Sequence, residues 1–92
     1  MGKFELGHII MTKGITEREA NNEGFANFLT DSMKRHSNGD WGDLSEEDKQ
    51  ENELSLKQGL RVLSKYHYGE EKILIVTDVD KSMTTILFPE EY

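Results

Sequence analysis

Two segments of the chain carry apolar side chains at the spacing of a helix. Between about residue 23 and residue 37 they recur three or four positions apart, and Asn38-Gly39 supplies the stop expected after a helix. The apolar positions of this first stripe are Phe25, Phe28, Leu29, Met33 and His36. A second stripe follows Ser45, a residue suited to cap a helix, and continues to Gly69; it contains Leu56, Leu60, Leu63 and Tyr66 or His67. The pattern predicts two helices, at about 23–37 and 45–69.

Three other segments have the pattern or composition of strands. Residues 4–12 alternate between two faces, and residues 72–77 and 83–88 are rich in β-branched side chains. The short linker 78–82 predicts an antiparallel hairpin with Asp78 and Asp80 as turn residues. Thr16 and Glu19 have the spacing of a capping box and predict a helical turn before the first helix. We expect one α+β domain over residues 1–92 in the order β-α-α-β-β, with a three-stranded antiparallel sheet and two helices packed on one face.

Each strand of the hairpin carries apolar side chains on both faces, and two helices on one side can cover only one of them. A bare apolar face is an aggregation liability, so we expect a symmetric homodimer through the sheet face away from the helices. Ile9 and Met11 are expected on that face. The alternative is that the segment 13–24 or the tail 89–92 folds over the face within one chain.

The negative charge of the chain is concentrated in one segment. The net charge is −7, and residues 40–53 contain seven acidic side chains against Lys49 alone, whereas the charges of residues 1–37 cancel. Direct binding to nucleic acid requires a basic footprint, so this composition argues against it. It favours a protein partner with a basic surface. The alternative is that the acids only stabilise the start of a helix, where the helix dipole favours negative charge.

The absence of cysteine excludes a disulfide framework and a thiolate zinc site. The first residues lack the apolar run of a signal peptide, and no segment approaches the ~20 apolar residues of a membrane span. We therefore expect a soluble, cytoplasmic protein with no membrane partner.

The only tryptophan lies between the two predicted helices, in Gly39-Asp40-Trp41-Gly42-Asp43. The preferred interpretation is that its ring is mostly buried and holds the loop against the second helix or the sheet. The flanking glycines would then allow a close approach of the backbone. The alternative is an exposed anchor for a partner, since tryptophan is enriched at interface hot spots.

His36 ends the apolar stripe of the first predicted helix. The preferred interpretation is a partly buried histidine near a helix C-terminus, where a positive charge is favoured. The alternative is a metal or general-acid site with Asp40 and Asp43, although metal ligation requires several convergent ligands. No Ser/His/Asp order and no phosphate-binding loop is present. The sequence therefore indicates no catalytic residue, no metal ligand and no cofactor.

A set of motifs extends over nearly the whole chain. They are Arg35-His36, Gly39-Asp40-Trp41-Gly42-Asp43, Glu47-Asp48, Asn52-Glu53, Gly59, Leu63-Ser64, Tyr66, Thr84-Thr85, Leu87 and Pro89-Glu90-Glu91-Tyr92. In these motifs the chain resembles a family of small bacterial proteins of plasmids, phages and other mobile elements, commonly labelled plasmid-related protein or "type I restriction endonuclease subunit M". A chain of 92 residues is too short for a doubly wound methyltransferase domain and has no Gly-rich cofactor loop. The resemblance therefore implies an association with mobile elements rather than methyl transfer.

Three candidate functions follow. The first is a non-enzymatic accessory or regulatory protein of a mobile genetic element that acts by protein–protein contact. The second is an acidic inhibitor of the DNA-mimic type, directed at a host defence or restriction nuclease. The third is a small enzyme or metal-dependent protein that uses His36 and Asp40. The candidate interaction residues are Trp41, Asp40, Asp43, Glu46, Glu47 and Asp48.

Overall fold

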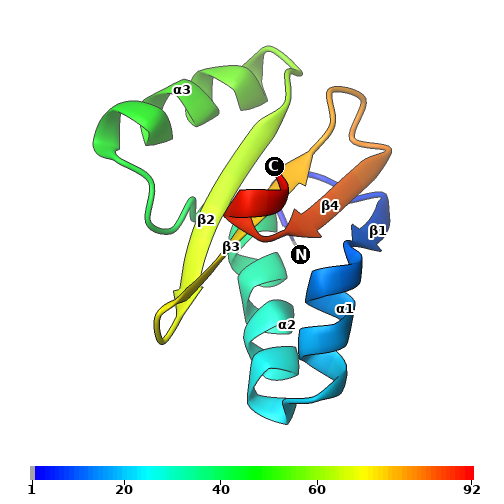
Figure 1. Cartoon of the computed structure of the whole chain (residues 1–92). Coiled ribbons are helices and arrows are strands. Elements are labelled where there is room, and N and C mark those ends of the chain that lie inside the picture. Colours follow the sequence, from blue (N-terminus) through cyan, green and yellow to red (C-terminus); the bar gives the residue numbers. More distant parts are fainter. Residues whose placement is uncertain (1) are drawn as a thin grey trace.

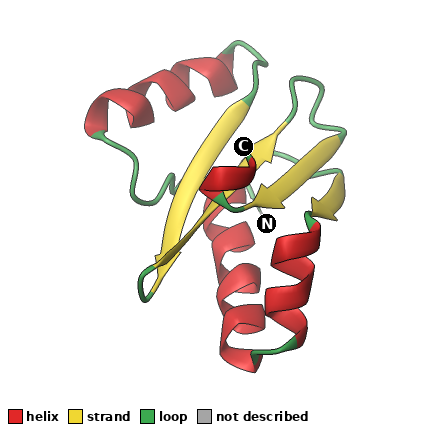
Figure 2. Cartoon of the chain, in the orientation of Figure 1, coloured by secondary structure: helices red, strands yellow, loops and turns green. Residues whose placement is uncertain are grey.

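The computed structural model describes residues 2–92 and combines four strands, three α-helices and a short C-terminal 3-10 helix (Figures 1 and 2). Along the chain these are β1 (His8–Met11), α1 (Lys13–Ala20), α2 (Glu23–Ser37), α3 (Glu46–Lys57), β2 (Val62–Tyr68), β3 (Glu71–Thr77), β4 (Met83–Leu87) and η1 (Pro89–Glu91). Within this described part of the chain, no helix has the length and apolarity needed to cross a membrane.

The four strands form one mixed sheet in the order β1-β4-β3-β2. The pairs β2–β3 and β3–β4 are antiparallel, whereas β1 runs parallel to β4, with His8 opposite Met83 and Met11 opposite Ile86. A parallel pair requires a long connection between its strands, and the chain from α1 to β3 provides it. The predicted α+β class is confirmed, but the three-stranded antiparallel sheet is wrong in its number of strands and in the direction of β1.

Two predicted elements agree closely with the structure. The first predicted helix is α2, whose N-cap Asn22 accepts a hydrogen bond from the Phe25 N–H at 2.9 Å and whose C-cap is followed by Gly39 at φ +80°. The predicted hairpin is β3–β4, and the Asp80 carboxylate in its turn accepts the Ser82 N–H at 3.0 Å. In both elements the local capping and turn residues agree with the tertiary fold.

The second predicted helix is wrong beyond its first half. α3 ends at Lys57, and Gly59 follows with φ +72°, a left-handed conformation that ends a helix without strain. The chain then enters β2, where buried and less buried residues alternate. Leu60 and Leu63 fit the helical spacing by coincidence, while the residues from Val62 onward have the two-residue period of a strand.

The first strand is shorter than the predicted 4–12 because Gly7 interrupts the extended chain with φ +66°. A Cβ atom at Gly7 would lie 2.3 Å from the backbone of Ser82, so the close approach of the two segments requires glycine there. The helical turn predicted near Thr16 is the complete helix α1. Its cap is Thr12, whose Oγ1 accepts the Ile15 N–H at 3.4 Å.

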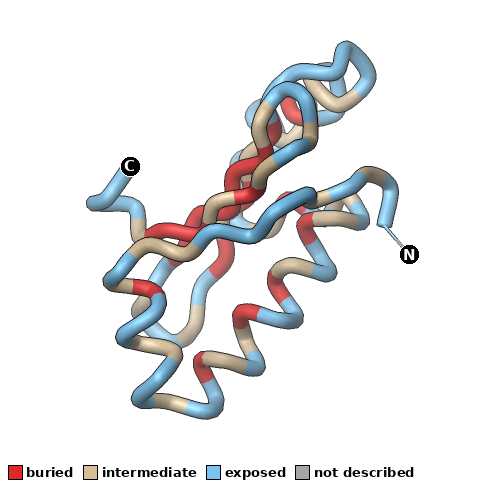
Figure 3. The backbone as a smooth tube through the Cα atoms, turned by 90° about the vertical axis from the view of Figure 1, so that its right-hand side faces the viewer, coloured by how far each residue is buried: buried red, intermediate tan, exposed pale blue. Residues whose placement is uncertain are grey.

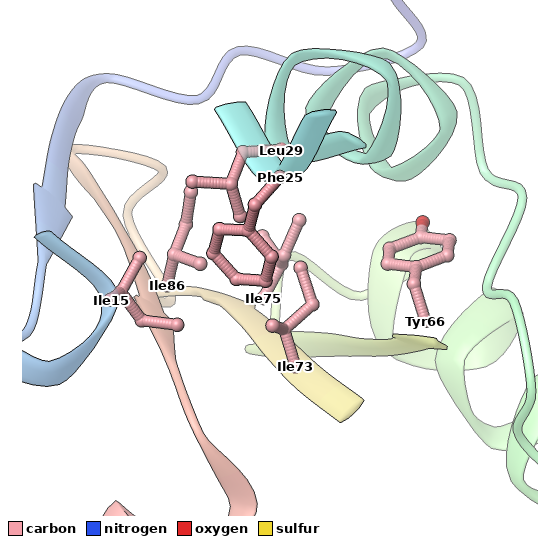
Figure 4. Packing of buried hydrophobic residues seen from close by; sticks show 7 residues of the cluster. All are labelled: Ile15, Phe25, Leu29, Tyr66, Ile73, Ile75 and Ile86. Carbon is pink, nitrogen blue, oxygen red and sulfur yellow. The ribbon is translucent and has the colours of Figure 1, made fainter. Parts of the chain in front are cut away.

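The main core lies between one face of the sheet and the helices α1 and α2 (Figure 4). Its fully buried members are Ile15, Phe25, Leu29, Tyr66, Ile73, Ile75 and Ile86. α1 contributes the first of these and α2 the next two, whereas α3 contributes none of the described members. Burying one large apolar side chain stabilises a fold by ~1.5–3 kcal/mol, so α1 and α2 are integral to this one.

The opposite face of the sheet carries a smaller apolar cluster of Leu74, Val76 and Leu87, with Leu63 packed against it. The three buried members are only 6–7% exposed. η1 contacts β3 on the side of the sheet away from α2, so the tail covers part of this face (Figures 1 and 3). The alternative that the tail folds over the sheet is thus confirmed, and the expected bare apolar face is wrong. Met11 also packs on the other side, against the main core. The homodimer itself stays a prediction.

Candidate functional site

Trp41 is buried in the loop between α2 and α3, with 3% of its surface exposed. Its indole Nε1–H donates a hydrogen bond to Glu53 Oε2 of α3 at 2.7 Å, and the Phe4 ring stacks on it at 6.1 Å between centroids. The prediction that Trp41 is buried and holds the loop in place is confirmed. The exposed-anchor alternative is wrong, because the ring has no accessible face.

The backbone beside Trp41 pairs with the outer edge of β2. The Trp41 carbonyl accepts the Lys65 N–H at 3.3 Å, and the Asp43 N–H donates to the Lys65 carbonyl at 2.7 Å. Between them, Gly42 has φ +73°, and a Cβ atom there would lie 1.9 Å from the Lys65 carbonyl oxygen. Only glycine therefore allows the loop to approach the strand this closely.

α3 is attached to β2 by the side chain of Asn52, for which the sequence pattern predicts no structural role. The Asn52 amide bonds to both backbone groups of Leu63, donating to its carbonyl and accepting its N–H at 3.3 Å. Asn52 is also the only buried residue of α3. The available signal was an asparagine in a helix interior, where this residue is disfavoured unless its side chain has a partner.

Three of the predicted acidic candidates have partners within the molecule. Asp40 pairs with Arg35 at 2.7 Å, and Asp43 pairs with His67 at 2.6 Å. The Arg35 guanidinium holds the pKa of the Asp40 carboxyl below its ordinary value. Glu46 lies 3.7 Å from Lys49, a looser and exposed contact. Asp40 and Asp43 therefore order the loop, and Arg35 already partly neutralises the charge of Asp40.

Three other acidic side chains of this region have no ion-pair partner among the described residues. Among residues 2–92, no basic side chain lies within ion-pair distance of Glu47, Asp48 or Glu51. Asn52 faces the sheet, so Glu47, Glu51 and Leu54 follow one another on the outer face of α3 at spacings of four and three residues. Leu54 is 55% exposed. We call Glu47, Asp48, Glu51 and Leu54 the acidic α3 face; Asp48, four residues before Asn52, lies at its inner margin beside the groove described below.

A groove of about 270 Å³ borders the acidic α3 face. It lies between α3, the start of β2 and the C-terminus, and it is lined by Leu44, Asp48, Glu51, Asn52, Ser55, Arg61, Leu63 and Tyr92. The Tyr92 ring is 63% exposed, and its hydroxyl accepts a hydrogen bond from Arg61 at 3.0 Å. The groove thus combines apolar surface with carboxylates on one wall.

His36 is fully buried and takes part in a chain of hydroxyl groups across three strands. Its Nδ1 lies 2.5 Å from Ser64 Oγ of β2, and its Nε2 lies 2.9 Å from Thr77 Oγ1 of β3. The chain continues to Thr84 Oγ1 of β4 at 2.8 Å and ends at the Leu6 carbonyl, 2.6 Å further on. This network joins α2 to the interior of the sheet.

The Leu6 carbonyl at the end of this hydroxyl network fixes the direction of the hydrogen bonds from there back to His36. A carbonyl oxygen only accepts, so Thr84 donates to Leu6 and must accept from Thr77. Thr77 must then accept from His36 Nε2–H. Burial lowers the pKa of His36 to about 4, so at pH 7 the ring is neutral, and Nδ1 accepts from Ser64.

The histidine site differs from both earlier interpretations. His36 is fully rather than partly buried, and it is neutral rather than charged. Both ring nitrogens have hydroxyl partners, and the Asp40 carboxylate is bonded to Arg35 instead. The structure therefore does not bring His36 and Asp40 together as a metal or general-acid pair. No group of three or more potential metal ligands occurs among residues 2–92.

A larger cleft of about 750 Å³ lies at the other end of the molecule, between α1, the β2–β3 turn and the tail. Arg18 and Glu71 line it and form a bidentate ion pair with distances of 2.5–3.0 Å. Arg18 holds the pKa of Glu71 below its ordinary value, so this carboxylate stays ionised and paired. The two residues are far apart in the sequence, and no local pattern connects them.

Comparison with known proteins adds no identification. The chain matches no protein-family model, no curated protein sequence and no solved structure.

Proposed function

We propose that this is a non-enzymatic accessory or regulatory protein that binds a basic protein surface through the acidic α3 face. The observation that carries the proposal is the set of carboxylates Glu47, Asp48 and Glu51, which have no basic partner among residues 2–92. Unpaired carboxylates of one sign on a projecting helix attract an opposite charge and accelerate its encounter. The association with a mobile genetic element rests on the resemblance of the sequence motifs.

The position of α3 supports a role in contact with a partner. The helix lies outside the main core; Asn52 attaches it to β2, and Glu53 attaches it to Trp41 in the preceding loop. The outer face of α3 therefore makes no packing contact with the main core. Leu54 can supply a small apolar contact among the carboxylates, and the neighbouring groove can accept a side chain of the partner.

The surroundings of His36 support the non-enzymatic part of the proposal. General acid–base catalysis requires a group that can reach the substrate, and this ring is enclosed by hydroxyl partners. Ser64 is also fully buried, so the Ser64–His36 contact holds the fold together and does not activate a nucleophile toward solvent.

Charge reversal on α3 tests the proposal. The wild-type protein and a Glu47→Lys/Glu51→Lys variant are immobilised and exposed to host lysate at low and at physiological salt. Bound proteins are then identified by mass spectrometry. We expect the wild type to retain a basic protein whose binding weakens with salt, and the variant to lose it.

A matched control changes the same number of charges elsewhere. Asp31→Lys/Glu70→Lys replaces two exposed acids of α2 and the β2–β3 turn, so the net charge of the two variants is equal. This control should retain the partner. Equal loss in both variants would show a non-specific charge effect, and equal retention would exclude the acidic α3 face as the site.

The DNA-mimic inhibitor is the second candidate. α3 carries five acidic side chains over 12 residues, a length of ~18 Å. Duplex DNA carries about ten phosphate charges over that length, so α3 alone has roughly half the charge density. Competition decides between the two candidates. A partner that duplex DNA displaces from the protein supports mimicry, whereas a partner that binds DNA and the protein together supports ordinary docking.

A further inference from the structure

β1 forms one edge of the sheet, and its outer side has no backbone partner. The N–H groups of His8 and Thr12 donate to the carbonyls of Ser82 and Ile86, at 2.9 and 3.2 Å, on the side of β4. Because backbone groups alternate in direction along a strand, the N–H and C=O groups of Ile9 and Met11 point to the other side. In the part of the chain that the structure describes, nothing pairs with them there.

The other edge of the sheet is closed. β2 has its outer backbone groups occupied by the Asn52 amide at Leu63 and by the Trp41–Asp43 segment at Lys65. Edge strands are usually protected by such covers, by charged or proline residues, or by bulges. β1 has no cover, charged side chain from Asp, Glu, Lys or Arg, proline or bulge in its sequence, His8-Ile9-Ile10-Met11, and is limited as a pairing edge only by its length of four residues.

The side chains of β1 are apolar and accessible on both faces of the sheet. Ile9 is 40% exposed on the helix side, and Ile10 is 43% exposed on the opposite side. Figure 3 shows β1 running across the front of the molecule toward α1; its first three residues are exposed, and its last is of intermediate burial. An added strand would bury apolar surface on both faces and would pair the free backbone groups.

We propose that β1 is the self-association site of this protein, where it pairs antiparallel with β1 of a second copy. The charges at the two ends of the strand support a second copy as the occupant. Glu5 lies three residues before the strand, and Lys13, which is also 3.9 Å from Glu17, begins the helix after it. An antiparallel pair centred on Ile9 brings the acid-bearing segment of one copy and the base-bearing segment of the other to the same end of the pair.

The location of the acidic segment also supports this arrangement. Residues 40–53, with a net charge of −6, lie beside β2, at the far edge of the sheet from β1. Strands are spaced ~4.8 Å apart, so the β1 axis lies ~14 Å from the β2 axis. In the dimer the two acidic segments would be at least ~28 Å apart, several times the ~8 Å screening length at physiological salt. Mutual repulsion therefore does not oppose this pairing.

The pairing is short, so the dimer is expected to be weak. β1 contains four residues, far fewer than the roughly 20–30 residues that each partner contributes to a stable interface. Association should therefore depend on concentration. The acidic α3 faces of both copies would stay exposed at the two outer ends of the dimer.

The test combines sedimentation with amide hydrogen exchange up to about 1 mM protein, where weak contacts become populated. The wild type should shift from 10.6 kDa toward twice that mass, and the Ile9 and Met11 amides should gain protection over the same concentration range. A single 10.6 kDa species at every concentration would overturn the proposal. So would association without protection of these two amides.

Two variants locate the contact. Ile9→Pro removes an N–H that makes no bond within the chain, so the monomer should fold while dimerisation is lost. Ile10→Lys places like charges at the contact and should raise the dissociation constant by about tenfold or more. Leu60→Lys is the control, since Leu60 has nearly the same exposure, 45%, but lies next to β2. If Ile10→Lys leaves the dissociation constant unchanged, pairing through β1 is contradicted. The same holds if Leu60→Lys raises the dissociation constant as much as Ile10→Lys does.

Discussion

α2 and α3 are helices of comparable length, with 15 and 12 residues, but different forces attach them to the sheet. α2 inserts Phe25 and Leu29 into the main core, where both are fully buried. α3 buries only Asn52 and depends on hydrogen bonds to β2 and to Trp41. Apolar burial makes α2 part of the cooperative fold. Hydrogen bonds hold α3 in position but leave its outer face exposed, as a binding surface requires.

Trp41 connects these two regions, so its removal is expected to have the largest effect. Trp41→Ala deletes a ring that is 3% exposed and contacts Phe4, His36 and Glu53. We expect a loss of ~3–5 kcal/mol in the free energy of unfolding, measured by urea denaturation. Trp41→Phe keeps most of the apolar volume and should lose less. An unchanged midpoint in Trp41→Ala would show that the ring does not hold the loop.

A matched pair of leucines measures the difference between the helices directly. Leu29 of α2 is 0% exposed, and Leu54 of α3 is 55% exposed. Leu29→Ala should cost ~2–5 kcal/mol of stability, whereas Leu54→Ala should change it by at most ~0.5 kcal/mol. Thermal and urea unfolding of the two variants provide the comparison. Similar losses in both would mean that α3 is packed as firmly as α2.

The buried histidine at the end of α2 predicts a dependence of stability on pH. The pKa of His36 is lowered from 6.5 to about 4 in the folded chain, so the unfolded chain binds more protons between these values. The contribution of His36 to the free energy of unfolding is therefore complete above pH 6.5 and is lost as the pH is lowered. Relative to pH 7, we expect the free energy of unfolding to be lower by about 2 kcal/mol at pH 5 and by about 3 kcal/mol at pH 4.

Measurement between pH 7 and pH 5 suits this test, because most ordinary carboxylates stay ionised in that range and the His36 variant identifies the contribution of its ring. The slope should disappear in His36→Gln, which removes the buried ring. Nitrogen chemical shifts of the ring should also report a proton on Nε2 at pH 7. A protonated ring at pH 6, or a proton on Nδ1, would contradict the direction of the hydroxyl chain.

Removal of the Asn52 clamp is expected to act on α3 alone. Asn52→Ala leaves the Leu63 N–H and carbonyl without their side-chain partner, which should cost ~1–3 kcal/mol. Hydrogen exchange should show lost protection in α3 and retained protection in α2. Asn52→Asp keeps an acceptor for the Leu63 N–H but places a buried carboxylate against the Leu63 carbonyl, so it should be at least as destabilising as Asn52→Ala. Equal loss of hydrogen-exchange protection in α2 and α3 would show that α3 is not attached independently of the main core.

Local signals accounted for the elements whose neighbours in sequence are also their partners in space. α2 was predicted correctly because its apolar stripe, its cap and the following Asn38-Gly39 are all local. The β3–β4 hairpin was predicted for the same reason. β2 was missed because Leu60 and Leu63 imitate helical spacing, and the role of this segment as a strand is stabilised by pairing with β3.

The sequence by itself determined the α+β class, the helix α2, the hairpin, the acidic segment and the burial of its tryptophan. These depend on periodicity, capping, turn chemistry and the composition of one loop. Only the tertiary structure decided the parallel placement of β1 against β4, the Asn52 clamp and the hydroxyl chain around His36. Each of these joins residues that are far apart in the chain, and hydrogen bonds between them leave no periodic trace in the sequence. Which edge of the sheet is closed and which stays open is likewise a consequence of packing.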